Sequence, residues 1–203
     1  MKPIIFNTAM VKAILDGPKT QTRRVMKPQP YEEEYLVVGN YTPALVDKNG
    51  DQYPADYQLF GAYTEDGELT WKCPYGQVGD RIWVRETWGV TYGWDNDSPR
   101  DIGQRETIYY KAGGSTNNEG THLHDVRKWR PSIFMPRRAS RITLEITEVR
   151  VEQLNCMTES DAHLEGVDNL VTFMLLWDRL NKKRGYEWKS NCWVWVITFK
   201  LCE

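Results

Sequence analysis

The run from Trp193 to Leu201 constrains the fold of this chain more than any other segment. Its middle, residues 194–197, is apolar at every position, so both faces of a strand there would be apolar. A continuous apolar run of this kind is typical of a strand buried in the centre of a sheet. The sequence therefore predicts a sheet with neighbouring strands on both sides of this one.

Two further segments have strand patterns. Residues 78–88 begin with a Gly-Asp turn and continue with alternating side chains, so that Trp83 and Arg85 lie on the same side. Residues 141–146 alternate with a period of two, and this alternation slips near Glu148. The slip predicts a bulge or a strong bend in that strand.

Three segments have helical patterns. The first covers residues 8–16 and ends at Gly17, a residue that readily takes the left-handed conformation. A short helix begins at Thr158, where Asp161 stands at the acid position of a capping box, and it ends at the following glycine. A longer helix over about 170–181 carries one apolar stripe, formed by Leu170, Phe173, Met174, Trp177 and Leu180.

These patterns predict the α+β class, because strands dominate and no alternation of strand and helix is present. We expect a small mixed β-barrel with two or three decorating helices. Residues 27–75 and about 92–130 are rich in glycine, proline and polar residues, and we interpret them as long loop insertions. A length of 203 residues fits one compact domain over 1–203.

Composition excludes several classes of protein. Hydrophobic residues make up 40%, with nine Trp and eleven Tyr, so disorder is not expected and some rings should line a binding surface. No apolar run approaches the ~20 residues that cross a bilayer, so we expect a cytoplasmic protein without a membrane partner. The net charge of -2 argues against a protein that coats nucleic acid by bulk electrostatics.

The segment from Gly17 to Arg24 is the first candidate site, because it holds an amine, two hydroxyls and two guanidinium groups within eight residues. Lys19, crowded by arginines, is a candidate base, and Thr22 a candidate nucleophile or positioning hydroxyl. The alternatives are an ordinary surface lysine and a threonine that only favours a strand. Glu165, at the end of the short helix, is either a catalytic carboxylate or a solvated one.

The second candidate site lies between Arg127 and Arg141, which contains six basic residues and no acid. Its mixture of guanidinium groups and aromatic rings is typical of contacts to phosphates and bases. The alternative is structural, with arginine stems covering apolar surface. From both regions together we predict these substrate-binding residues: Arg24, Trp83, Arg85, Trp129, Arg137 and Arg138.

Cofactor and metal motifs give no support for a bound group. The sequence contains no phosphate-binding P-loop, no dinucleotide-binding glycine motif, no Gly-x-Ser-x-Gly and no His-Glu-x-x-His. His122 and His124 flank Leu123 and can face one way, but no third ligand is indicated by the spacing. We therefore expect no cofactor and no metal.

Four elements resemble the ASCH domain family, which has a PUA-like fold, and more closely the phage and prophage ASCH-containing proteins of about 200 residues. The elements are residues 17–24, 79–88, 135–141 and 194–199. They span both ends of the chain and leave the two predicted insertions uncovered. The resemblance implies a PUA-like barrel.

The resemblance also implies an activity. Small bacterial members of the family are amidohydrolases that remove the acetyl group of N4-acetylcytidine with a Lys and a Thr of a Gly-x-Lys-x-x-Thr motif and a distant Glu. Lys19 and Thr22 match that motif, and Arg24 matches a family arginine that follows the threonine. Residues 157–165 are similar to the segment that carries the distant Glu, which places this carboxylate at Glu165. In this hypothesis Lys19 activates Thr22 or a water against an acyl amide, Glu165 orients or relays the proton, and Arg24 or Arg85 holds charge.

Other functions fit the same resemblance. Some ASCH proteins are thought to bind RNA and some are reported as nucleases, so a nuclease or a non-catalytic RNA- or DNA-binding module of phage origin is the alternative to an amidohydrolase. The partner would then be RNA or single-stranded nucleic acid in place of a nucleoside. An assembly protein that uses its exposed aromatic loops is a third interpretation.

Overall fold

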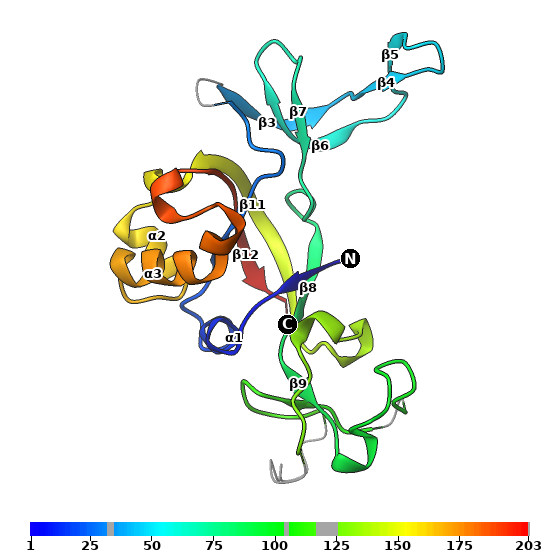
Figure 1. Cartoon of the computed structure of the whole chain (residues 1–203), viewed down its shortest axis with the longest axis vertical. Coiled ribbons are helices and arrows are strands. Elements are labelled where there is room, and N and C mark those ends of the chain that lie inside the picture. The colour runs from blue at the N-terminus through cyan, green and yellow to red at the C-terminus, as the bar shows by residue number, and fades with distance from the viewer. Residues whose placement is uncertain (32–34, 104–105, 117–125, 203) are drawn as a thin grey trace. The chain divides into compact units, whose positions relative to one another are not determined.

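The computed structural model describes residues 1–31, 35–103, 106–116 and 126–202, and these form a mixed α+β fold with several sheets and few helices, as predicted (Figure 1). The chain divides into two compact units. The first consists of Met1–Thr20, Arg81–Glu145 and Lys200–Glu203, and the second of Gln21–Asp80 and Ile146–Phe199. Whether the chain is a single domain with two insertions stays a prediction.

In the first unit, strand β8 (Arg81–Arg85) lies between two neighbours. It pairs in parallel with β1 (Lys2–Ile5) and antiparallel with the first residues of β11 (Thr143–Gln153). The register sets Trp83 opposite both Pro3 and Thr143. Trp83 is therefore surrounded on both strand edges, and its side chain is buried.

Helix α1 (Thr8–Leu15) connects to β1 and has a clear start and end. The side chain of Asn7 accepts a hydrogen bond from the backbone N–H of Met10 at 2.9 Å, which caps the first turn. Val11 and Ile14 are the buried residues of the helix. Gly17 follows with φ of 102°, a conformation that favours glycine, so the predicted stop is confirmed.

A second set of elements in the first unit builds its own buried cluster. Strands β9 (Trp88–Gly89) and β10 (Tyr109–Tyr110) pair antiparallel. The buried cluster around them consists of Trp88, Val90, Ile102, Ile108, Tyr110, Met135 and Ala139. Residues 92–130, which the sequence suggests are loops, thus contribute apolar side chains to a core.

In the second unit, strand β12 (Trp193–Leu201) lies between β11 and β2 (Gln21–Val25) in the hydrogen-bonded order. Residues 194–197 are all buried, which confirms the predicted central strand. The pairing with β2 is antiparallel and sets Thr22 opposite Ile197.

These pairings do not close into the expected barrel. The order is β1-β8-β11 in the first unit and β11-β12-β2 in the second. Within the described residues, β1 has only β8 as a strand neighbour and β2 has only β12. The sheet is therefore open at both of these strands, because no pairing joins them.

Residues 27–75 form small antiparallel sheets, in line with the hairpins that their sequence indicates. Strand β6 (Leu59–Thr64) pairs with β3 (Leu36–Tyr41) and β7 (Thr70–Lys72). Strands β4 (Ala44–Val46) and β5 (Gln52–Pro54) form a separate two-stranded ladder. Figure 1 labels all five strands.

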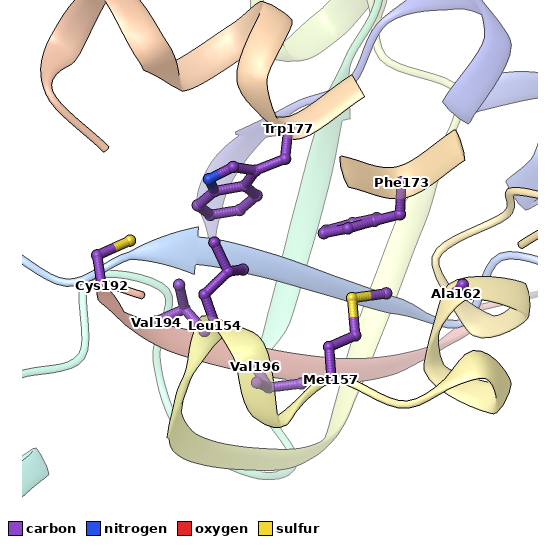
Figure 2. Packing of buried hydrophobic residues seen from close by; sticks show 8 residues of the cluster. All are labelled: Leu154, Met157, Ala162, Phe173, Trp177, Cys192, Val194 and Val196. Atoms are coloured by element: carbon purple, nitrogen blue, oxygen red, sulfur yellow. The ribbon is translucent and has the colours of Figure 1, made fainter. Parts of the chain in front are cut away.

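Helices α2 (Glu159–Leu164) and α3 (Leu170–Asn181) pack with β12 in the second unit. Figure 2 shows Phe173 and Trp177 of α3 directed toward Leu154, Met157 and Val194. The rings of Phe173 and Trp177 stack with centroids 5.9 Å apart. Leu180, which the sequence assigns to the same stripe, is 53% exposed, so the buried stripe ends one turn earlier than predicted.

Candidate functional site in the second unit

Strand β2 carries the predicted nucleophile and the predicted anion-binding arginine. Thr22 is buried and Arg24 is half-buried, and their backbones pair with Ile197 and Trp195 of β12. Burial raises the pKa of the Tyr75 phenol, and the positive charge of Arg24 acts on it in the opposite direction. Arg24 therefore adds positive charge beside a phenol of the same unit.

The predicted carboxylate, Glu165, follows the last turn of α2. Thr158 and Asp161 form a complete capping box at the start of this helix. The Thr158 side chain accepts the backbone N–H of Asp161, and the Asp161 side chain accepts the backbone N–H of Thr158. The backbone N–H of Glu165 donates to the carbonyl oxygen of Asp161 at 2.8 Å. The helix is thus fixed at both ends, and the Glu165 side chain is buried.

Glu165 lies against the peptide bond that links Thr22 to Arg23. The backbone N–H of Arg23 donates to Glu165 Oε1 with an N–O distance of 2.5 Å, across 142 residues of sequence. A carboxylate that accepts a buried backbone N–H is held in one orientation. The Glu165 carboxylate therefore lies at the peptide bond between Thr22 and Arg23 in the second unit.

Arg23 organises this site, and the sequence alone did not single it out. Its side chain is completely buried and forms ion pairs with three carboxylates: Glu152 at 2.7 Å, Asp161 at 3.2 Å and Glu165 at 3.5 Å. Its Nη1 also donates to Gln21 Oε1 at 2.6 Å. Its burial could not be read from the sequence of β2, because all three carboxylates come about 130 residues or more later in the chain.

A second arginine neutralises part of the remaining acidic charge. Arg150, which is about one-third exposed, contacts Glu152 at 3.2 Å and Asp161 at 3.3 Å. Burial by itself raises the pKa of Asp161, but the hydrogen bonds from Thr158, together with Arg23, outweigh it and lower the pKa to about 2. Asp161 is therefore ionised at neutral pH and remains a fixed partner of Arg23.

Lys19, the predicted base, belongs to the first unit. It is buried, with 2% of its surface exposed, so the interpretation as an ordinary surface lysine does not hold. Its backbone N–H donates to the carbonyl oxygen of Ala13 at 3.0 Å, and its Nζ lies 5.4 Å from the ring centroid of Phe6. A lysine is rarely buried without a specific role or partner.

The other predicted substrate-binding residues all lie in the first unit and behave differently from one another. Arg85 and Arg137 both lie over the ring of Trp83. Trp129 is half-buried, and Arg138 is exposed but donates to three backbone carbonyl oxygens, at 2.6, 3.2 and 3.3 Å. Whether Trp129 and Arg138 bind a substrate stays a prediction.

One further ion pair, between buried Glu86 and the more exposed Arg141, lies outside the predicted site. Glu86 and Arg141 form a two-point pair at 2.9 and 3.0 Å, and the Arg141 guanidinium lies 4.0 Å from the ring centroid of Tyr110. Burial raises the pKa of Glu86 although Arg141 acts in the opposite direction. Burial also raises the pKa of Tyr110 to about 12. This cluster stabilises the first unit, since its donors and acceptors are satisfied internally.

His122 and His124, the weak metal candidates, lie outside the described residues. Within the described ranges, no three His, Cys, Asp or Glu side chains are grouped in a way that would hold a metal ion. Nor does any described helix have the length and apolar character needed to span a membrane.

Comparison of the chain with family models, with curated proteins and with solved structures gives no match.

Proposed function

We propose that the protein is a hydrolase of the ASCH family that removes an acyl group from the exocyclic nitrogen of an N4-acylcytidine-type substrate. One observation supports the proposal: Glu165 Oε1 accepts the backbone N–H of Arg23, so the carboxylate lies at the peptide bond that follows Thr22 although it comes 142 residues after Arg23. The resemblance of residues 17–24 and 157–165 to the two family motifs also implies that Thr22 and Glu165 act in one site. A PUA-like fold and a cytoplasmic location are part of this proposal.

The proposed chemistry is hydrolysis of an amide. Lys19 takes a proton from the Thr22 hydroxyl or from a water, and the resulting nucleophile attacks the acyl carbonyl carbon. The bond between this carbon and N4 breaks, and N4 leaves as the amine with a proton that Glu165 relays. If Thr22 is the nucleophile, water then hydrolyses the ester on its oxygen and releases the carboxylic acid.

The surroundings of Glu165 suit this role. Arg23 contacts it through both the backbone N–H and the guanidinium, so the carboxylate has little freedom to rotate. Arg24, the next residue but one after Thr22, supplies positive charge for the oxyanion that forms on the carbonyl oxygen. A fixed carboxylate and a nearby cation are the arrangement that proton transfer at an acyl group requires.

The test measures the conversion of N4-acetylcytidine to cytidine, with substrate and product separated and quantified by chromatography. Thr22→Val, which keeps the side-chain shape and removes the hydroxyl, should lower the rate by about 100-fold or more, as should Lys19→Met. Thr20→Val is the matched control, because it removes a hydroxyl two positions earlier in the same segment. Near-ultraviolet circular dichroism should show that all variants are folded.

If Thr22→Val deacylates the substrate as fast as Thr20→Val, the proposed role of Thr22 is wrong. If the wild-type protein does not deacylate N4-acetylcytidine or N4-acetylcytidine within an RNA strand, the proposed reaction is wrong.

A further inference from the structure

Three of the arginines between residues 127 and 141 use their N–H donors within the first unit. Arg130 donates to the carbonyl oxygens of Trp94 and Asp97, and Arg138 to those of three other residues. Arg141 is paired with buried Glu86. The guanidinium groups of these three arginines hold loops and strands of the first unit together.

Arg137 and Arg85 are arranged differently. Their guanidinium carbons lie 5.7 and 4.8 Å from the ring centroid of Trp83, so the two groups cannot be farther apart than these distances combined. Within the described part of the chain, neither forms an ion pair with a carboxylate, and the only hydrogen bond of the Arg137 side chain is a long one of 3.4 Å to Thr143 Oγ1. Arg85 Nε is buried and has no hydrogen-bond partner among the same residues.

Each of these two guanidinium groups makes a cation–π contact with the Trp83 ring, which attracts the positive charge without neutralising it. The N–H fork of an arginine binds oxyanions at two points. Trp83 is buried by its neighbours on β1 and β11, so it acts as a rigid support for both. The result is two positive groups, held near one ring, that pair with no carboxylate of the described residues.

Arg81, the other arginine of β8, shows the contrast. Alternation along the strand places Arg81 on the same side as Trp83 and Arg85, and Arg81 stands directly opposite Glu145 of β11. The pKa of Glu145 is lowered first by Lys200, which lies 2.9 Å away, and also by Arg81. Arg81 therefore has an acid beside it, whereas Arg85 and Arg137 form no ion pair with any carboxylate in the described ranges.

We propose that Arg85 and Arg137, supported by Trp83, form a binding site for a phosphate group. A phosphate offers three oxygens or two in a diester to two guanidinium forks, and its charge offsets the uncompensated positive charge. The phosphate belongs either to a free nucleotide or to the backbone of a single-stranded nucleic acid. This site goes beyond the deacylation reaction, and its test uses binding alone.

The experiment measures fluorescence anisotropy of a labelled ten-nucleotide RNA strand that lacks terminal phosphates, at several salt concentrations. Arg85→Gln and Arg137→Gln should each raise the dissociation constant by about tenfold, as expected for the loss of one charge-assisted contact. Each should also reduce the slope of log affinity against log salt by about 0.7, the value for one phosphate contact on a single strand. Arg100→Gln, a change of equal charge on an exposed residue of the same unit, should leave both quantities unchanged.

Competition experiments distinguish the two sources of phosphate. If cytidine 5′-monophosphate and inorganic phosphate bind with the same dependence on Arg85 and Arg137 as the strand, the site accepts a free phosphate. If only the strand binds with that dependence, the site reads a nucleic-acid backbone. Acetate at equal ionic strength should compete less well than inorganic phosphate, because acetate carries a single charge and two oxygens, whereas phosphate carries more charge and more acceptor oxygens.

Three results would overturn the phosphate site. One is that neither Arg85→Gln nor Arg137→Gln differs from Arg100→Gln, and another is that the wild-type protein binds neither the strand nor a free phosphate. The third is that acetate competes as well as phosphate. Because Arg137 is exposed, its substitution remains informative even if Arg85→Gln fails to fold.

Discussion

Replacing Arg23 with methionine should destabilise the protein by about 3–5 kcal/mol, the cost typical of removing one partner from a buried ion pair. The magnitude follows from the burial of the site. The guanidinium has no exposed surface, and its three carboxylate partners have only 6–16% of their side-chain surface exposed. Methionine fills a similar volume, so the loss reports charges and hydrogen bonds left without a partner more than a cavity.

Arg150→Met is the matched control, because Arg150 contacts two of the same carboxylates from a position that is about one-third exposed. Ion pairs open to solvent contribute about 1 kcal/mol or less. In equilibrium urea unfolding, Arg23→Met should lower the midpoint by roughly 1.5–2.5 M for a slope of about 2 kcal/mol/M, and Arg150→Met by about 0.5 M or less. Equal shifts for the two variants would refute the reasoning.

The pH dependence of the Arg23→Met effect provides a second check. Asp161 has a folded pKa of about 2, below its ordinary value of 3.8, so its contribution to stability is present above about pH 4 and is lost as the pH falls toward about 2. Part of this lowering comes from Arg23. The gap in unfolding free energy between wild type and Arg23→Met should therefore narrow when the pH falls from about 7 to about 3.

Two further predictions concern packing in the second unit. Gly61→Ala should lower the unfolding midpoint, because a Cβ at Gly61 would overlap the backbone carbonyl of Trp71 next to β6. Gly39→Ala on the paired strand is the control, since a Cβ there meets only an ordinary contact. Equal effects of the two substitutions would contradict this. Phe173→Ala should lower the free energy of unfolding, measured in urea, by about 3–5 kcal/mol, as for other buried aromatic residues. Leu175→Ala, at a 70% exposed position, should lower it by less than about 1 kcal/mol. The reverse order would contradict the packing in Figure 2.

Local sequence patterns were sufficient for the elements whose form depends on neighbours in the chain. The apolar run at 193–201 became β12 with the predicted bounds, and the cap pattern at Thr158 became a complete capping box. The slip in alternation near Glu148 is also present, since β11 buries Leu144 and Ile146 and then Val149. In each case the signal and its physical cause lie within a few residues of each other.

The parts that could not be predicted depend on partners far away in sequence. Arg23 is buried because Glu152, Asp161 and Glu165 surround it, and these residues come about 130 positions or more later in the chain. The same limit applies to the basic segment at 127–141. Its composition shows six cations, but only the structure shows which guanidinium edges are bonded to backbone carbonyl oxygens.

The buried charges at Arg23 are better explained by orientation than by stability. A well-packed apolar group often stabilises a fold at least as much as a buried ion pair does, because burying charge carries a large desolvation cost. The ion pairs do, however, connect the end of α2 to one residue of β2, since Glu165 contacts both the backbone and the side chain of Arg23. This connection depends on the register that sets Thr22 opposite Ile197. A shift of one residue would turn Arg23 to the other face of the strand, so the register of a strand pair determines whether Glu165 meets the backbone next to Thr22.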